Sequence, residues 1–208
     1  MERPRIIPVD PNSPADAAIQ EAMEWLSRGE PVVLPTETVY GLVCRPDLPG
    51  AIERVFAVKE RTKVRPLPRM VASIEDLQLH VSDWSGCAVR LAEKFWPGPL
   101  TLILNTATGA ISFRIPDHPV LVALLKRAPV PLAVTSANRS GEEDSLTARA
   151  AANALGPDIP LILDAGPARM AKHHTVVDCT GEHPRLIDEA AISAEELRDV
   201  CEDLIVDG

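Results

Sequence analysis

The chain has 208 residues, of which 46% are hydrophobic and 25% charged, and its formal net charge is −9. This balance predicts one globular domain with a sizeable core. No apolar run approaches the roughly 18 residues of a membrane span, and the N-terminus leads into no apolar leader, so we expect a cytoplasmic protein. The negative charge argues against non-specific nucleic-acid binding, which needs many lysine and arginine contacts to phosphate.

Helices and strands alternate along the chain. Ser13 and Pro14 have the pattern of a helix cap and first helical residue, and Gly29 the pattern of a helix end. The predicted helices are 14–28, 51–59, 89–95, 120–127, 148–155 and 194–204. The predicted strands are 31–35, 39–43, 100–104, 111–114, 132–134, 161–164 and 175–178. Some connections are too short for a parallel crossover, so we expect an α/β domain with a mixed sheet.

Cysteines and histidines give no sign of a cross-linked or metal-bound protein. The four cysteines are scattered without a C-x-x-C pair, so we expect reduced thiols rather than a disulfide framework or a zinc site. His173 and His174 are adjacent, and neighbours on a strand point to opposite faces. We therefore expect no metal site of the protein's own.

The strongest local feature is the basic segment 59–67, KERTKVRPL. Residues 54–69 contain six lysines and arginines against a single acid, Glu60, in a chain that is acidic as a whole. Arginine offers a planar fork to phosphate oxygens and lysine a compact charge, so an anion site is one interpretation. A solvated basic loop is the alternative. The common phosphate-binding glycine loops are absent from the sequence.

Two polar turns interrupt apolar strands, at 36–38 (TET) and at 135–138 (TSAN). Polar groups beside a core must be hydrogen-bonded, either to the protein or to a ligand. The crevice beyond the carboxyl end of a strand is where α/β folds commonly bind ligands. Turns whose hydroxyls bond their own backbone, and helix caps, are the alternatives.

Taken in order along nearly the whole chain, these segments resemble the YrdC-like family, the threonylcarbamoyl-AMP synthases. The matching segments are PTETVYGL (35–42), the 59–67 loop, FWPGPLTLIL (95–104), ISFRIPDHPV (111–120), TSANRSG (135–141), TVVDCTG (175–181) and AISAEEL (191–197). The resemblance implies a single YrdC-like domain over 1–208, with a twisted mixed parallel and antiparallel sheet and flanking helices around a basic cavity.

The resemblance also implies a reaction and its partners. Members join L-threonine, bicarbonate and ATP into threonylcarbamoyl-adenylate and pyrophosphate, with Mg²⁺ carried in by ATP and no tightly bound cofactor. The product feeds modification of adenosine 37 in tRNA through downstream threonylcarbamoyl-transfer proteins. Some members have been described as double-stranded RNA binders. No membrane partner is expected.

Particular residues match the family's binding positions. Thr38 and Arg114 match positions that contact threonine, with Arg114 expected to hold the carboxylate. Lys59, Arg61 and Arg65 match the basic set that binds the ATP phosphates. Lys59 and Arg61 are the expected catalytic residues, because they would offset the charge that grows on the phosphoryl group.

Ser136 and Asn138 match the family's contacts to the nucleotide. Four positions depart from the usual pattern of the family, including the position of a serine that contacts threonine and that of an arginine that faces the nucleotide. They are Met70, Asp144, His174 at the serine position and Asp188 at the arginine position. These departures leave open a divergent paralogue that binds another nucleotide or phosphorylated ligand. The basic segment leaves open a second alternative, a non-catalytic double-stranded RNA-binding module, although the net charge of −9 argues against it.

Overall fold

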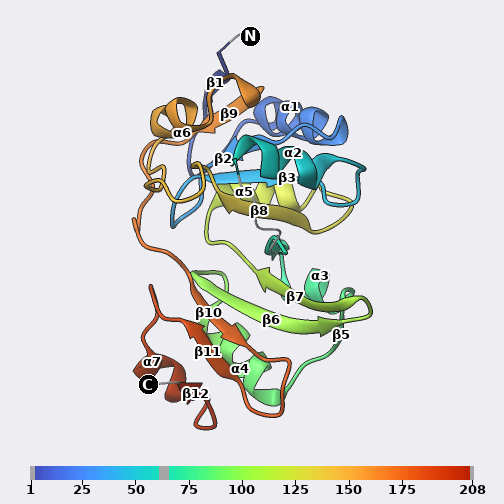
Figure 1. Cartoon of the computed structure of the whole chain (residues 1–208), viewed down its shortest axis with the longest axis vertical. Helices are drawn as coiled ribbons and strands as arrows, with labels where there is room; N and C mark the ends of the chain where they lie inside the picture. The colour runs from blue at the N-terminus through green and yellow to red at the C-terminus, as the bar shows by residue number, and fades with distance from the viewer. Residues whose placement is uncertain (1–2, 61–65, 207–208) are drawn as a thin grey trace. The chain divides into compact units, whose positions relative to one another are not determined.

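The computed structural model describes residues 3–60 and 66–206, and the chain divides into two compact units (Figure 1). Unit 1 comprises Met1–Leu67 and His118–Ala171, and unit 2 comprises Pro68–Asp117 and Lys172–Gly208. Each unit has a sheet and an apolar core. The description of 1–208 as one domain stays a prediction. No described helix combines the length and apolar character that a membrane crossing requires.

Unit 1 is built on a mixed sheet with helices packed against it. Its strands run in the order β1, β9, β2, β3, β8, with β9 parallel to β1 and β2, and β3 antiparallel to β2 and β8. The strands are β1 (Arg5–Pro8), β2 (Val32–Leu34), β3 (Gly41–Cys44), β8 (Leu132–Ser136) and β9 (Leu161–Asp164). The helices are α1 (Asp16–Ser27), α2 (Ala51–Val58), α5 (Pro119–Leu125) and α6 (Ala148–Leu155), followed by the 3-10 turn η1 (Gly156–Asp158).

The central strands of unit 1 are apolar along their whole length because both faces of the sheet are covered. Every residue of β2 and β3 is buried. Val33 and Leu42 share a core with buried residues of α2 and α6. Successive side chains of a strand point to opposite faces, so the side chains of Val32 and Leu34 project from the other face of the sheet, where they are also fully buried.

The strands of unit 2 run in the order β4, β7, β6, β10, β11, β12, with β5 antiparallel to β6. Strand β6 is antiparallel to β7 and parallel to β10. The strands are β4 (Arg69–Met70), β5 (Val81–Asp83), β6 (Leu100–Thr106), β7 (Gly109–Arg114), β10 (Thr175–Asp178), β11 (Arg185–Asp188) and β12 (Ile205–Val206). The helices are α3 (Ile74–Gln78), α4 (Gly86–Phe95) and α7 (Ala194–Arg198).

One face of the unit 2 sheet carries its apolar core. Leu100, Leu102 and Leu104 alternate along β6 and pack with Phe113 of β7 and with residues of α4 and α7. The side chains of the residues between them, beginning with Thr101, therefore project from the opposite face. This alternation fixes which side chains of β6 and β7 can contribute to a binding site.

Helix boundaries differ from the sequence-based expectation by up to six residues, and α4, for example, begins at Gly86 rather than at residue 89. Helix α1 begins at Asp16 and Ser13 does not cap it, because Asp10 Oδ1 accepts the backbone N–H groups of Asn12 and Ser13 and holds this stretch in a turn before the helix. Helix α7 ends at Arg198 rather than at 204. The carbonyl of Val200 accepts from Arg90 Nε at 3.1 Å, outside the helical hydrogen-bond pattern.

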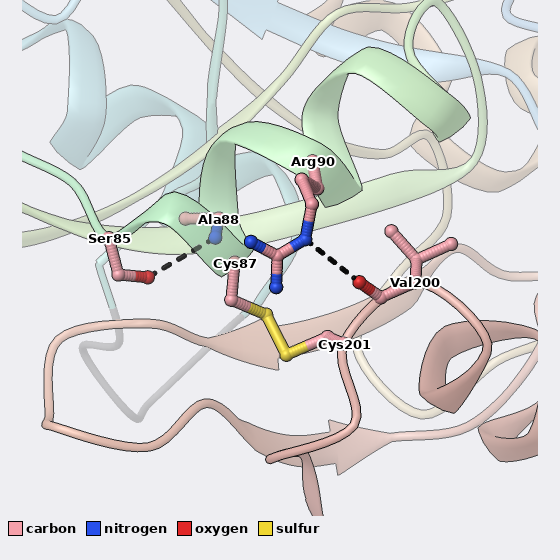
Figure 2. The surroundings of a disulfide bond; sticks show 6 residues. All are labelled: Ser85, Cys87, Ala88, Arg90, Val200 and Cys201. Carbon is pink, nitrogen blue, oxygen red and sulfur yellow. Dashed lines mark hydrogen bonds between the residues drawn. A yellow bond between two sulfur atoms is a disulfide. The ribbon is translucent and has the colours of Figure 1, made fainter.

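The expectation of reduced thiols is wrong for one pair of cysteines. Cys87, in the first turn of α4, and Cys201, which follows α7, form a disulfide with their Cα atoms 5.5 Å apart (Figure 2). Both belong to the apolar core of unit 2. The pairing could not be predicted from the sequence, because 114 positions separate the two cysteines. Only the packing of α4 against the segment that follows α7 brings them together. Cys44 and Cys179 are free and buried.

Candidate functional site

In unit 1, the TET turn between β2 and β3 is a buried hydroxyl network. Thr36 Oγ1 donates to the carbonyl of Val39 at 2.6 Å and accepts the backbone N–H groups of Thr38 and Val39. Thr38 Oγ1 lies 2.9 Å from Thr36 Oγ1. Because the single proton of Thr36 goes to Val39, Thr38 is the donor in this contact. Thr36 therefore orders the turn, and it fixes the orientation of the hydroxyl of Thr38.

Gly41 is required where this turn meets β8. A Cβ atom on Gly41 would lie 2.9 Å from Val134 Cγ1 and 3.4 Å from Thr36 Cγ2. A side chain at this position would force the side chain of Val134 to shift and would crowd Thr36. The close approach holds the TET turn against the strand that leads into the TSAN turn.

Lys59 connects the end of α2 to the TSAN turn. Its ammonium Nζ donates to the carbonyls of Ser136 at 2.5 Å and Asn138 at 2.7 Å, and lies 3.3 Å from Asn138 Oδ1. The side chain is only 3% exposed. A buried ammonium needs such partners, since an unpaired charge in the interior is costly. Lys59 thus organises the chain around the two residues expected to contact the nucleotide.

The TSAN turn is also held by contacts from its own neighbourhood. Asn138 Nδ2 donates to the carbonyl of Glu142 at 2.7 Å, and the backbone N–H of Ala137 donates to the carbonyl of Tyr40 at 2.8 Å. Ser145 Oγ donates to the carbonyl of Ala137 at 2.7 Å, while the carbonyl of Ser145 accepts the N–H of Tyr40. Ser145 is therefore a residue of this region that the sequence analysis did not single out.

Tyr40 ties the TET turn to the segment that follows β9. Its hydroxyl donates to the carbonyl of Gly166 at 2.6 Å and accepts the N–H of Ala165 at 3.3 Å. Burial, followed by the nearby charge of Asp164, raises the pKa of Tyr40 far above its ordinary value. Tyr40 therefore stays protonated and serves as a structural donor at physiological pH.

We predict that Lys59→Met lowers both the melting temperature and the affinity for ATP. Hydrogen bonds from a charged group contribute about 1.5–3 kcal/mol, and 1 kcal/mol corresponds to about 2–4 °C in a chain of this size, so a fall of roughly 5 °C is expected. Thermal melting with and without ATP measures both effects. Lys126→Met, which removes an exposed lysine of the same unit, is the control. A melting temperature equal to the wild type would contradict the structural role of Lys59.

Arg61 and Arg65, the other two members of the expected phosphate-binding set, lie outside the described residues. Asp144 is half-buried in unit 1. A surface pocket of about 380 Å³ is also present in unit 1, lined by Glu30, Pro31, Arg54, Ala57, Val58 and Asp158. It contains none of the expected site residues. In the described part of the chain, no group of three or more His, Cys, Asp or Glu side chains could hold a metal ion.

In unit 2, Arg114 is the largest fully buried side chain, with 2% of its surface exposed. It ends β7, and its Nε donates to the carbonyl of Gly98 at 3.1 Å. This bond fixes the plane of a guanidinium that carries four further N–H groups on its terminal nitrogens. A buried, oriented guanidinium suits the bidentate binding of a carboxylate.

Strand register places further residues on the same sheet face as Arg114. Met70 is directly opposite Arg114 across the parallel β4–β7 pair. Leu102 is opposite Phe113, so continuing the antiparallel register by one residue puts Thr101 opposite Arg114. Thr101 is in turn paired with Val176 of β10, and Val176 with Asp188 of β11. We call the row formed by Met70, Arg114, Thr101, Val176 and Asp188 the Arg114 face. Two of these residues, Met70 and Asp188, depart from the family pattern; Met70 is buried and Asp188 is exposed.

His174 precedes β10 and is influenced by Arg114. The pKa of His174 is lowered to about 3, first by burial, then by the positive charge of Arg114 and that of His173. The imidazole is therefore neutral at physiological pH, with one nitrogen a donor and the other an acceptor. A neutral histidine beside a buried arginine can offer a hydrogen bond without adding to the local positive charge.

We predict that His174 makes the protein less stable in acid. The unfolded chain binds a proton at this histidine below about pH 6.5, whereas the folded protein does so only near pH 3, so stability falls as the pH drops between these values. The slope is at most about 1.4 kcal/mol per pH unit. Urea unfolding of wild type and His174→Asn at pH 7.5, 5.5 and 4.5 measures it.

The advantage of the variant over the wild type should grow steadily as the pH falls. His183→Gln, which removes an exposed histidine of the same unit, should behave like the wild type. If the difference between wild type and His174→Asn is the same at all three pH values, the histidine is not held neutral in the folded protein.

These features define a class: an α/β protein with polar turns at the ends of buried strands in one unit and a buried, oriented arginine on a sheet face of the other. The chain belongs to the Sua5/YciO/YrdC family, whose model, described as telomere recombination, matches residues 24–190. The match includes parts of both units. The family resemblance found in the sequence is confirmed.

Named relatives agree with this membership. The chain is 33% identical to the threonylcarbamoyl-AMP synthase of Bacillus subtilis over 209 residues, covering 95% of this chain but 60% of the relative. It is 33% identical to the putative threonylcarbamoyl-AMP synthase of Mycobacterium tuberculosis, covering 88% of each. The chain thus spans the length of some relatives and about three-fifths of others.

Solved structures show the same fold. The structure of Sua5 from Pyrococcus abyssi complexed with L-threonine matches with a TM-score of 0.91 and 30% identity, over 98% of this chain and 62% of that chain. YciO of Escherichia coli matches with a TM-score of 0.83 over 93% of this chain and 99% of that one; at 24% identity this likeness concerns the fold alone. The predicted class, a mixed sheet with flanking helices, is confirmed. The basic cavity stays a prediction.

Proposed function

We propose that the protein is a threonylcarbamoyl-AMP synthase that uses L-threonine, bicarbonate and ATP. The amine of threonine and bicarbonate form an N-carboxylate with loss of water. An oxygen of this N-carboxylate attacks the α-phosphorus of ATP, the bond to the β-phosphate breaks, and pyrophosphate leaves with the Mg²⁺ that ATP carried in. The products are threonylcarbamoyl-adenylate and pyrophosphate. No covalent intermediate with the protein is required.

The observation that carries the proposal is the likeness to the threonine-bound Pyrococcus relative over nearly the whole chain. In unit 2, Arg114 has the burial and orientation that a carboxylate ligand requires. In unit 1, the hydroxyl of Thr38 is oriented by Thr36, and we assign it to threonine. These two residues are the proposed threonine contacts.

We assign the ATP phosphates to Lys59, Arg61 and Arg65, and the nucleoside to Ser136 and Asn138. Within the described chain, Lys59 holds the carbonyls of Ser136 and Asn138, so its charge and the two nucleotide contacts form one connected group. Lys59 and Arg61 would offset the negative charge that develops during attack at the α-phosphorus. We expect Lys59 to act through both its charge and its hold on the turn.

Release of pyrophosphate tests this function. Wild-type protein with ATP and Mg²⁺ should release pyrophosphate only when L-threonine and bicarbonate are both present. Omitting either one should stop the release, and L-valine, which lacks the hydroxyl, should support much less of it. Release that is independent of threonine, or absent with all substrates present, would contradict the proposal.

A related candidate function is favoured by His174. The family resemblance implies a smaller serine at the position of His174, so an imidazole there would change the shape of the amino-acid site, which fits a divergent paralogue with another acceptor. A thermal-shift screen of nucleotides and amino acids separates the two functions. Stabilisation by ATP with L-threonine above all other pairs supports the synthase, whereas a stronger response to another amino acid or phosphorylated ligand supports the paralogue.

The proposed product determines the partners downstream. Threonylcarbamoyl-adenylate would be passed to threonylcarbamoyl-transfer proteins that modify adenosine 37 of tRNA, and the cytoplasm is the setting we propose. Direct binding of double-stranded RNA is less favoured, because the chain carries a net charge of −9. If such binding occurs through the basic segment, it should weaken steeply with salt.

A further inference from the structure

Thr101, at the second position of β6, has a buried hydroxyl that the fold itself does not use. The residue is 1% exposed, and among the described residues no group forms a hydrogen bond with its Oγ1. Leaving a buried hydroxyl unpaired is unfavourable because the group has lost its hydrogen bonds to water, so such a group calls for a specific explanation. Valine would fit the same strand without this cost.

The position of Thr101 indicates what the hydroxyl is for. Its neighbours along β6, Leu100 and Leu102, point into the apolar core, so the side chain of Thr101 projects from the opposite side, which is the Arg114 face. Continuing the register of Leu102 with Phe113 puts Thr101 next to Arg114 on the adjacent strand. On its other side Thr101 is paired with Val176, which offers no polar group. Directly opposite residues on neighbouring strands have Cβ atoms about 4.5–5.5 Å apart.

Thr175 on the adjacent strand is a buried threonine whose hydroxyl is fully hydrogen-bonded within the protein. Its Oγ1 donates to the carbonyl of Ile192 at 2.8 Å and accepts the N–H groups of Ala190 and Ile192. It is fully buried and faces the apolar core side, because it is paired with Leu100. Two buried threonines on neighbouring strands thus differ: one hydroxyl makes three bonds within the protein and the other makes none with the described residues.

We propose that the hydroxyl of Thr101 binds the carboxylate of the amino-acid substrate together with Arg114. This inference rests on the proposed function and adds a specificity-determining contact to it. A carboxylate has about four lone-pair sites, more than one guanidinium fork occupies, and it can accept the proton of a neighbouring hydroxyl. Thr101 therefore recognises the ligand's carboxylate as a neutral donor beside the charge of Arg114. It takes no part in the transfer to phosphorus.

Thr101→Val tests this contact because valine keeps the shape and removes only the hydroxyl. The KM for L-threonine and its Kd by calorimetry should rise about tenfold to a hundredfold, the loss of one hydrogen bond to a charged partner. The kcat at saturating threonine should change little, because the contact is present before and during the reaction. The melting temperature should stay equal or rise. Thr101→Ser, which restores a hydroxyl, should recover most of the affinity.

Two controls separate this role from a structural one. Thr175→Val should lower the melting temperature while leaving the KM for threonine unchanged, which is the opposite pattern. L-threoninol, which lacks the carboxylate, should bind wild type and Thr101→Val equally weakly. Equal binding of L-threonine by wild type and Thr101→Val would overturn the inference and leave the proposed function intact. If wild type itself binds no L-threonine, the proposed function fails, and the inference fails with it.

Discussion

Replacing Arg114 with methionine should reduce the affinity for L-threonine by about a hundredfold to ten-thousandfold. Methionine fills a similar volume but removes the charge and the fork of donors. Each hydrogen bond to a charged group contributes about 1.5–3 kcal/mol, so losing a bidentate pair corresponds to about two to four factors of ten in Kd. Calorimetric titration with L-threonine measures the effect. Arg114→Lys should recover only part of the loss, because an ammonium cannot make the planar two-point contact.

Arg114 is also part of the fold, so its variants need a control for folding. The carbonyl of Gly98 loses its bond from Arg114 Nε in Arg114→Met, and some loss of stability is expected. Binding of ATP alone, which we assign to residues of unit 1, should remain close to that of the wild type. Arg198→Met removes an exposed arginine of unit 2 and should leave threonine binding unchanged. If Arg114→Met binds both ATP and L-threonine as well as wild type, Arg114 does not contact the substrate.

Removing the Cys87–Cys201 disulfide should be the most destabilising change outside the site. The bond closes a loop across 114 positions, and the chain-entropy model gives about 4.7 kcal/mol for a loop of roughly that length. At about 2–4 °C per kcal/mol, the melting temperature should fall by roughly 10 °C or more on reduction. The double variant Cys87→Ala, Cys201→Ala should melt near the reduced wild type, and a reductant should not lower it further.

Thiol counting gives an independent test of the same bond. In denatured, unreduced protein only Cys44 and Cys179 should react with a thiol reagent, and all four cysteines should react after reduction. Cys179→Ala calibrates the cost of removing a buried sulfur from the same core without breaking a bond. Four reactive thiols in protein purified under oxidising conditions, with no effect of reductant on melting, would show that the bond does not form.

Much of the fold could be predicted because many elements are apolar runs with clear boundaries. Strands β9 and β10 are found at the predicted residues, and β6 contains its predicted segment, because each is a run rich in buried aliphatic side chains. Strand β11 was missed. Three of its four residues, including Arg185 and Asp188, are exposed, and it is a strand only because β10 and β12 pair with it. Local sequence carries little trace of such pairing.

In the site, too, the chemistry of single residues could be predicted from the sequence, but the contacts between residues far apart in the sequence could not. The charge of Lys59 could be read from the sequence, but its bonds to carbonyls 77 and 79 positions away could not. Thr101 was not singled out, because a threonine inside LTLIL is typical of an ordinary strand. Only the register of β6 with β7, and the missing partner of its hydroxyl among the described residues, distinguish it. The lowered pKa of His174 likewise depends first on burial and then on the charge of Arg114, 60 positions away in the sequence.

The fate of the bicarbonate carbon tests the central claim most directly. Protein incubated with L-threonine, ATP, Mg²⁺ and ¹³C-labelled bicarbonate should yield an adenylate whose mass equals threonine plus one ¹³C-labelled carbon dioxide plus AMP, less one water. The label should reside in the carbonyl between the amine and the phosphate. Mass spectrometry that finds this labelled species, together with an equal amount of pyrophosphate, is the result we predict. An unlabelled threonyl-adenylate, or ADP and phosphate without any labelled adenylate, would contradict the claim that this chain makes threonylcarbamoyl-AMP.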